Sequence, residues 1–248
     1  MKRWLRPISR PLRELLRKRG YDIVSLPAGG APADVRMRWI DRLDIDLTID
    51  VGANKGHFVG WMRDRGYGGP ILSFEPQRDA FEACEARWKD DPNWSGIRAA
   101  LGEAEAELEL HVAGNSFSSS LRPMLDSHVD ALPESAIVST EMVPVMRLDA
   151  AIPKKHAAAR RIFLKIDTQG YEDTVLSGAT GLMDRVGLIE LELSLVPLYE
   201  GQALMPEMME KVAALGFVPI ALEQGFVSTV DERLLQVDCI FARADWLA

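Results

Sequence analysis

Short apolar runs of strand length alternate along this chain with segments whose apolar residues recur at helical spacing. The runs that we expect to form strands of one sheet are 47–51, 71–75, 94–99, 161–167 and 187–193. Segments with helical spacing lie before, between and after them, at 32–43, 57–65, 78–89, 172–183 and 205–215. This alternation predicts the α/β class, with a doubly wound and mostly parallel sheet.

The rest of the pattern predicts smaller features around this sheet. Residues 107–112 alternate polar with apolar positions and are expected to form an extra, half-exposed strand, and 143–147 another short strand. Residues 114–140 are poorly periodic and rich in serine, which indicates a lid or an insertion. Residues 218–222 and 236–242 are expected to close the sheet as a hairpin.

The first strand ends in an acid and a glycine turn, residues 50–56 (Asp-Val-Gly-Ala-Asn-Lys-Gly). Glycines let the backbone approach a ligand closely, and Asp50 would lie beside a nucleotide-like cofactor at the mouth of the sheet. Lys55 lacks the Gly-Lys-Ser/Thr context of a P-loop, and the Gly-x-Gly-x-x-Gly turn of dinucleotide-binding proteins is missing. A tight strand-to-helix turn without a ligand is the alternative interpretation.

A second acid, Glu75, ends the next predicted strand and is followed by Pro76, which stops the strand. A carboxylate at this place suits a bidentate grip on the two hydroxyls of a ribose. Alone, Glu75 would also be compatible with an ordinary solvated acid. Together with the Asp50 turn at this spacing, it indicates an adenosyl ligand.

Acids also occur at the ends of the fourth and fifth predicted strands, where ligands of open parallel sheets bind. Asp167 is expected to project into the crevice, and a structural acid that caps the turn is the alternative. Strand alternation puts Glu190 and Glu192 on one face, where polar groups are costly unless they are paired or line a cavity. We therefore place Glu192 in the crevice, and the direction of Lys165 stays open.

Six motifs, in this order, resemble the signature of the FkbM family of S-adenosylmethionine-dependent methyltransferases. They are Asp-Val-Gly-Ala-Asn-Lys-Gly (50–56), Phe-Glu-Pro (74–76), Ala-Leu-Gly (100–102), Ser-Ser-Ser-Leu (118–121), Val-Met-Arg-Leu-Asp (145–149) and Leu-Lys-Ile-Asp-Thr-Gln-Gly-Tyr-Glu (164–172). The resemblance covers roughly residues 45–243. It implies a class I methyltransferase domain over 45–248, with a Rossmann-like sheet of about seven strands that includes a C-terminal antiparallel strand.

The resemblance also implies S-adenosylmethionine as the cofactor. The residues that would bind it are Asp50, Gly52, Ala53, Asn54, Gly56, His57, Glu75, Pro76, Ala100, Leu101 and Asp167. The implied activity is O-methylation of a hydroxyl of a sugar in a glycan, a glycolipid or a related natural product. Methylation of a polyketide-type or other small-molecule hydroxyl and a non-catalytic adenosyl-binding module are the alternatives, and the missing glycine turn disfavours an NAD-dependent oxidoreductase.

Methyl transfer to an aliphatic hydroxyl requires a group that removes the proton of the attacking oxygen. We prefer Asp167 for this role and Glu192 second, with His128 in reserve should the insertion at 114–140 fold over the site. No metal site is predicted, because the spacing of Asp167 and Glu192 gives no metal-ligand signature; a divalent cation shared by the two carboxylates is the open alternative.

Charge is distributed unevenly along the chain. The first 20 residues hold eight Lys or Arg and one acid, whereas residues 21–248 hold 21 basic and 36 acidic residues, a formal charge of −15. Apolar residues are interleaved among the N-terminal basic ones, although Pro7 and Pro11 interrupt their helical spacing. We interpret 1–44 as a basic helical extension whose first 20 residues associate with an anionic membrane surface, and a helix packed on the domain is the alternative. The acidic remainder repels phosphates, which argues against nucleic acid as a partner.

Composition agrees with a globular protein. The 248 residues are 47% hydrophobic and 27% charged, which is ordinary for this class and sufficient for a buried core. Cys84 and Cys239 have no ligand or redox spacing, so we expect buried free thiols in a reducing, cytoplasmic setting. No apolar run has the length of a membrane span, and no signal-peptide core follows the basic start. The expected location is the cytoplasm, at the inner face of the membrane if residues 1–20 bind it.

Overall fold

The computed structural model describes residues 14–15, 18–19 and 34–247. The chain divides into two compact units, Met1–Val35 and Arg36–Ala248, and the second contains both β-sheets. This unit begins earlier than the predicted boundary at residue 45, because Ile40 and Leu43 are buried in its core. Apart from the four residues named, the predicted membrane-binding segment, 1–20, lies outside the described part of the chain.

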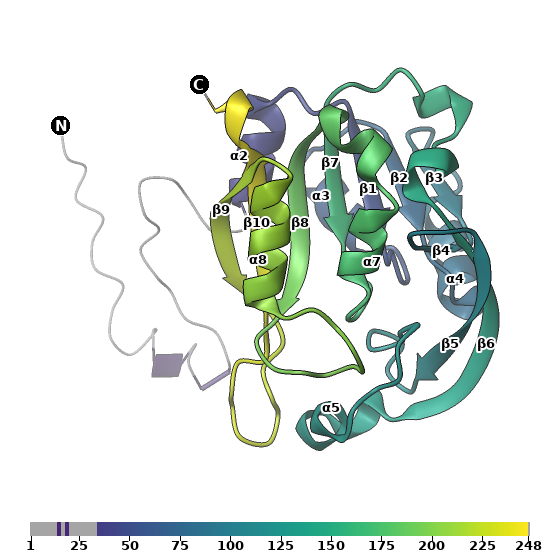
Figure 1. Cartoon of the computed structure of the whole chain (residues 1–248), viewed down its shortest axis with the longest axis vertical. Helices are drawn as coiled ribbons and strands as arrows, with labels where there is room; N and C mark the ends of the chain where they lie inside the picture. The colour runs from purple at the N-terminus through teal and green to yellow at the C-terminus, as the bar shows by residue number, and fades with distance from the viewer. Residues whose placement is uncertain (1–13, 16–17, 20–33, 248) are drawn as a thin grey trace. The chain divides into compact units, whose positions relative to one another are not determined.

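A seven-stranded sheet with the order β3-β2-β1-β7-β8-β10-β9 is the centre of this unit (Figure 1). Its strands are β1 (Leu47–Val51), β2 (Ile71–Phe74), β3 (Trp94–Ile97), β7 (Ile162–Ile166), β8 (Val186–Ser194), β9 (Phe217–Gln224) and β10 (Gln236–Arg243). The first five strands in the order pair in parallel, and β10 runs antiparallel to both of its neighbours. The predicted fold class, a doubly wound and mostly parallel sheet with a C-terminal antiparallel strand, is confirmed.

Helices cover both faces of the sheet, which is why all five residues of β1 are buried. The helices are α2 (Asp34–Arg42), α3 (His57–Asp64), α4 (Arg78–Trp88), α7 (Glu172–Ser177) and α8 (Met205–Ala214). Figure 1 shows α7 and α8 on the near face, with α3 and α4 behind the strands. Val175 and Met208 belong to one core cluster, and Val59 of α3 belongs to a second with Ile40 of α2. Burying one such side chain stabilises the fold by about 1.5–3 kcal/mol.

A second sheet, with the order β4-β6-β5, contains part of the predicted insertion. Its strands are β4 (Ala100–Leu101), β5 (Ala106–Ala113) and β6 (Ile137–Met146). The strand predicted at 143–147 therefore begins earlier, within the stretch 114–140. Its first four residues, Ile-Val-Ser-Thr, are exposed and do not alternate apolar with polar positions, so the sequence shows no strand period there. The insertion also contains the short helix α5 (Asp126–Ala131) and the 3₁₀ turn η1 (Pro133–Ser135).

The helix predicted at 172–183 is shorter in the structure. It ends at Ser177, and the chain continues as the 3₁₀ helix η3 (Thr180–Arg185). Gly178 follows α7 because a Cβ there would lie 1.9 Å from the carbonyl oxygen of Gly102. The remaining short elements are α6 (Leu148–Ala151), η2 (Lys154–His156) and η4 (Ala244–Trp246).

Cys84 and Cys239 are buried free thiols, as predicted. A small apolar cluster joins the helix α5 to the loops after β8 and β9, with Leu198, Tyr199 and Leu235 buried in it. Across the described helices, none is long and apolar enough to cross a membrane.

Candidate active site

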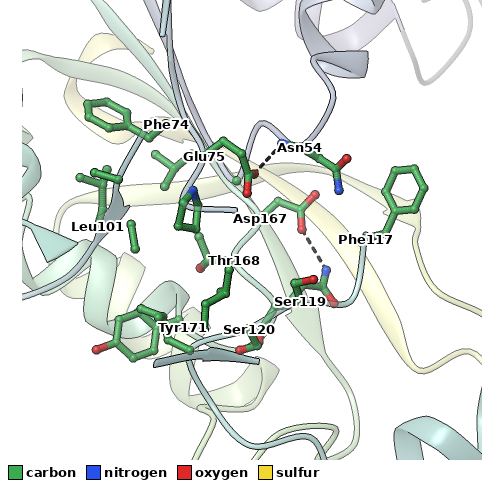
Figure 2. Close-up of a pocket in the computed structure, with 18 of the residues that line it drawn as sticks. Asn54, Phe74, Glu75, Leu101, Phe117, Ser119, Ser120, Asp167, Thr168 and Tyr171 are labelled. Carbon is green, nitrogen blue, oxygen red and sulfur yellow. Dashed lines mark hydrogen bonds between the residues drawn. The ribbon is translucent and has the colours of Figure 1, made fainter. Parts of the chain in front are cut away.

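A cavity lies at the carboxyl ends of β1, β2 and β7 (Figure 2). The chain runs from β1 outwards to β2 and β3 and later returns to β7 on the other side of β1. The order of strands thus reverses between β1 and β7, and ligands of open α/β sheets bind at such a reversal. Residues 99–101, 116–117 and 119–121 form another part of its wall.

Two glycines shape the turn after β1, and both are required by protein packing. Gly52 has a φ of 80°, and a Cβ there would lie 1.8 Å from the carbonyl oxygen of Asp167. Gly56 has a φ of 74°, and a Cβ there would lie 2.6 Å from the indole nitrogen of Trp88. Gly52 therefore brings the β1 turn against the β7 turn at the cavity, whereas Gly56 docks α4 and does not line the cavity. Close approach to a ligand, which the sequence suggested, does not explain Gly56.

Glu75 lines the cavity with both carboxylate oxygens fixed by backbone donors. The backbone N–H of Asn54 donates to Oε2 at 2.7 Å (Figure 2), and that of Gln77 donates to Oε1 at 2.9 Å. Burial raises the pKa of Glu75 to about 7, although these two donors oppose the shift. A carboxylate oxygen accepts more than one hydrogen bond, so each oxygen can also accept a hydroxyl. Glu75 consequently fits the ribose of an adenosyl group.

The two ends of the cavity differ in polarity. Phe74, Leu101 and Tyr171 lie together at one end, and Asn54 and Phe117 lie at the other (Figure 2). The first end is suited to a flat, apolar base, because aromatic and aliphatic side chains surround it. Glu75 lies between the two ends, as a ribose would require. The donor set and the apolar end together fit an adenosyl cofactor.

Asp50 lies beneath the cavity and does not line it. Its side chain is fully buried, with Oδ1 3.5 Å from Lys165 Nζ, and Oδ2 accepts the Ser73 hydroxyl at 3.4 Å. Burial raises the pKa of Asp50, and Lys165 opposes that shift. Asp50 therefore acts on the site through Lys165 and not by touching a ligand.

Lys165 is the cation of the site, which the sequence analysis left without a direction. Its Nζ lies 3.3 Å from Asp167 Oδ2 as well as near Asp50, because residues two apart on a strand share a face. Burial alone would lower the pKa of Lys165, but the carboxylates of Asp167, Asp50 and Glu190 together raise it above its ordinary value. The lysine therefore stays charged and balances the acids around it.

Asp167, at the carboxyl end of β7, lines the cavity with its side chain 38% exposed. The Gln169 side chain, which the sequence analysis did not consider, joins it to Glu192. Its Nε2 donates to Asp167 Oδ1 at 3.0 Å and to Glu192 Oε2 at 2.7 Å, and its Oε1 accepts the Tyr199 hydroxyl at 2.9 Å. Gln169 has a φ of 56°, a strained value for a residue other than glycine that is typical of functional sites.

Glu192 does not line the cavity but lies behind Gln169. Gln236 Nε2 also donates to its Oε2, at 2.8 Å. Burial, followed by the charges of Asp167 and Asp238, raises the pKa of Glu192 well above its usual value. Of Asp167 and Glu192, only Asp167 can be reached by a molecule in the cavity. Glu192 influences Asp167 through the side-chain amide of Gln169. Within residues 34–247, no group of three or more side chains is assembled that could hold a metal ion.

His128, the reserve base, is not at the site. It is 1% exposed, and the ring centroids of Tyr199 and Phe226 lie 5.2 Å from its own. Burial lowers its pKa to about 4, so it is neutral at physiological pH. The structure thus corrects the assignment of His128 as a reserve base. Apolar packing of α5 turns its side chain into the small cluster that contains Leu198, Tyr199 and Leu235. The insertion reaches the cavity through residues 116–117 and 119–121 instead.

The cavity brings together most of the predicted cofactor residues. Those that line it are Gly52, Asn54, Glu75, Pro76, Ala100, Leu101 and Asp167. Those that do not line it are Asp50, Ala53, Gly56 and His57. Lining residues that the sequence analysis missed include Phe117, Ser119, Ser120, Thr168, Gln169 and Tyr171. All but Phe117 fall within motifs quoted for the resemblance, so position within those motifs was the available signal.

The family model for the methyltransferase FkbM domain matches residues 50–219. No curated protein matches the chain. The bifunctional kinase-methyltransferase WbdD is similar to it with a TM-score of 0.50 and 14% identity, over 87% of this chain and 41% of that one. Magnesium protoporphyrin IX methyltransferase (ChlM) from Synechocystis PCC 6803, solved with bound S-adenosylmethionine, has a TM-score of 0.46 and 8% identity, over 85% of this chain and 77% of that one. At 14% identity, the likeness to WbdD shows the fold alone.

Proposed function

Because this chain belongs to the FkbM methyltransferase family and uses S-adenosylmethionine as methyl donor, we propose that it methylates a hydroxyl of a sugar in a glycan, a glycolipid or a related natural product. The observation that carries the proposal is the exposure of the Asp167 carboxylate and the two partners that hold it. This carboxylate is partly exposed in the cavity and is held on one oxygen by Lys165 and on the other by Gln169. A carboxylate fixed in this way can accept a proton from an oxygen nucleophile.

The chain's own residues supply binding, orientation and proton transfer. S-adenosylmethionine, when bound, supplies a methyl group on a sulfonium, which is already a strong leaving group. Glu75 would hold the ribose hydroxyls, and the end of the cavity with Phe74, Leu101 and Tyr171 would hold the base. Asp167 would take the proton of the acceptor hydroxyl. Holding donor and acceptor in reacting geometry accounts for a large part of such catalysis.

Lys165 and Gln169 would position Asp167 for this step. Both of their contacts are to its carboxylate oxygens, so the side chain cannot rotate without losing a hydrogen bond. Lys165 also places a positive charge 3.3 Å from Asp167 Oδ2, beside the atom that would take the proton. Glu192 shares the amide of Gln169 and is expected to affect the rate indirectly.

The lining of the cavity favours an acceptor with many hydroxyls. Ser119, Ser120 and Thr168 bring side-chain hydroxyls to it, and Asn54 brings an amide. Polar groups that converge on a pocket fix the orientation of a ligand that can pair with them. A saccharide presents both donors and acceptors on every side, which suits this lining.

Two measurements test the function. Calorimetry should show binding of S-adenosylhomocysteine and none of NAD. Incubation with labelled S-adenosylmethionine and envelope glycolipid extracts should label a saccharide head group with a methyl ether that resists mild base. Label in a carboxyl ester, an amine or a polyketide-type compound would contradict the sugar hydroxyl as acceptor.

We further propose that residues 1–20 bring the protein to an anionic membrane surface, where a lipid-linked saccharide would be presented. The support is the eight basic residues of this segment beside an otherwise acidic chain. Sedimentation with anionic vesicles should pellet the full chain, with much less of a chain that lacks residues 1–20. Neutral vesicles are the control, and equal pelleting of both proteins by anionic vesicles would refute the proposal.

A further inference from the structure

Phe117 presents a phenyl ring to solvent at the edge of the cavity. Its side chain is 59% exposed and lines the cavity, and it is the only aromatic among the large apolar side chains that are exposed in the described part of the chain. An exposed aromatic ring at a pocket gains nothing from burial in the protein itself. Because this ring lines the cavity, it is free to contact a ligand that enters there.

The loop that carries Phe117 is held firmly at several points. Asn54 Nδ2 donates to the carbonyl oxygen of Ser116 at 2.9 Å, and the Tyr199 hydroxyl lies 2.9 Å from the carbonyl oxygen of Ser118. The Ser120 hydroxyl donates to the carbonyl oxygen of Gln169 at 2.7 Å. The residues on both sides of Phe117 are thus fixed to the turns after β1 and β7. The exposure of the ring is consequently a built feature of the site.

Phe117 is not part of the end of the cavity that would hold the adenosyl group. Phe74, Leu101 and Tyr171 form that end, and Phe117 lies at the opposite side of the cavity, beyond Asp167 (Figure 2). The exposed ring of His57 is its neighbour, with 5.9 Å between the ring centroids. His57 and Phe117 thus form a pair of neighbouring exposed rings on the side of the cavity away from the adenosyl end.

We propose that Phe117, with His57 beside it, is the platform on which a pyranose ring of the acceptor lies face-on. A pyranose has a face of C–H groups and an edge of hydroxyls. One phenyl ring can contact that face, while Ser119 and Asn54 nearby can pair with the edge. A polyketide-type acceptor would call for a continuous apolar lining, and at this end of the cavity Phe117 stands among polar groups. The proposal rests on the proposed function and names the chemical class of its acceptor.

Kinetics with the labelled glycolipid acceptor gives the first test. Phe117→Ala should raise the acceptor KM about 5–30-fold, equivalent to about 1–2 kcal/mol at 1.4 kcal/mol per tenfold. Phe117→Trp should preserve KM, because an indole also offers a flat face. In both variants kcat and the Kd of S-adenosylhomocysteine should change little. The matched control is Leu222→Ala, which removes a side chain that is 56% exposed on β9, at the far edge of the sheet.

Binding of simple sugars gives a second test that needs no turnover. Methyl glycosides of glucose, galactose, mannose and rhamnose would be added to the full chain with saturating S-adenosylhomocysteine, and saturation-transfer NMR recorded. We expect transfer to ring C–H protons in the native protein and the Leu222→Ala variant, and its loss in Phe117→Ala. Mannitol, an acyclic polyol without a ring face, should show none.

Four results would overturn the platform. They are unchanged transfer to the glycosides in Phe117→Ala, absence of transfer to every glycoside, equal transfer to mannitol, and stronger transfer to 2-naphthol, a flat aromatic probe added in the same way, than to the glycosides. A loss of S-adenosylhomocysteine affinity in Phe117→Ala would also refute it, because the ring would then belong to the donor site. Failure of the native protein to bind S-adenosylhomocysteine would instead contradict the proposed function, so the two failures are distinguishable.

Discussion

Lys165→Met tests the charge balance beneath the cavity. The variant keeps the apolar stem of the side chain and removes the cation 3.5 Å from Asp50 Oδ1. At an effective dielectric constant of about 20, this attraction is about 5 kcal/mol, and breaking a buried ion pair typically costs about 3–5 kcal/mol. Because Asp50 is fully buried, water cannot replace the lost partner. We therefore expect the free energy of unfolding to fall by about 3–5 kcal/mol.

The pH dependence of this loss has a definite sign. Burial already raises the pKa of Asp50, and without Lys165 it would rise further. An acid whose pKa is higher in the folded than in the unfolded state contributes stability that is lost as pH rises through the folded pKa. The variant should therefore be less destabilised at about pH 5 than at about pH 8.

Urea denaturation followed by circular dichroism measures both effects. Asp50→Asn in the Lys165→Met background should recover stability, with a coupling of about 2–3 kcal/mol in the double-mutant cycle. The exposed Lys154 provides the control, since Lys154→Met should leave the midpoint unchanged. A loss below about 1 kcal/mol that adds independently to that of Asp50→Asn would refute the role assigned to Lys165.

Two further predictions concern Glu75 and His128. Glu75→Gln should weaken binding of S-adenosylhomocysteine about 10–100-fold in calorimetry, because hydrogen bonds to a charged group contribute about 1.5–3 kcal/mol. Since the pKa of Glu75 is raised to about 7, affinity of the native protein should decline as pH falls below that value, and the variant should lack this dependence; equal affinities would remove Glu75 from the donor site. His128→Phe should keep kcat and lose no stability, because Nδ1 of this buried ring has no hydrogen-bond partner. The pKa of His128 is lowered to about 4, so its contribution to stability falls as pH drops from its unfolded value towards 4, and the variant should resist acid better; a large fall in kcat would return His128 to the mechanism.

The sheet and the position of its acids follow from local patterns. Apolar runs separated by helical segments predict parallel strands, and the carboxyl ends of such strands meet at one edge. Glu75 and Asp167 end different strands and line the same cavity for this reason. The same rule fails for Asp50, because it lies within β1 and its side chain turns under the cavity.

Other features depend on pairing that no single segment reveals. The register places Asp50, Lys165 and Glu190 opposite one another on β1, β7 and β8, and this row of charges exists only once the strands pair. The loop of Phe117 is ordered by the contacts of Ser116 with Asn54 and of Ser120 with Gln169, partners far away in the sequence. Residues 114–140 have no apolar period of their own. Their pattern therefore predicted neither the cavity wall that they supply nor the burial of His128.

The most direct test of the central claim is Asp167→Asn. This substitution keeps the size of the side chain and removes the carboxylate that would accept the proton. Turnover of labelled S-adenosylmethionine with the glycolipid acceptor should fall by about 10²–10⁴-fold, the usual contribution of a general base. The Kd of S-adenosylhomocysteine, measured by calorimetry on the same protein, should stay within about threefold, or about 0.7 kcal/mol. Full turnover in this variant would contradict the account.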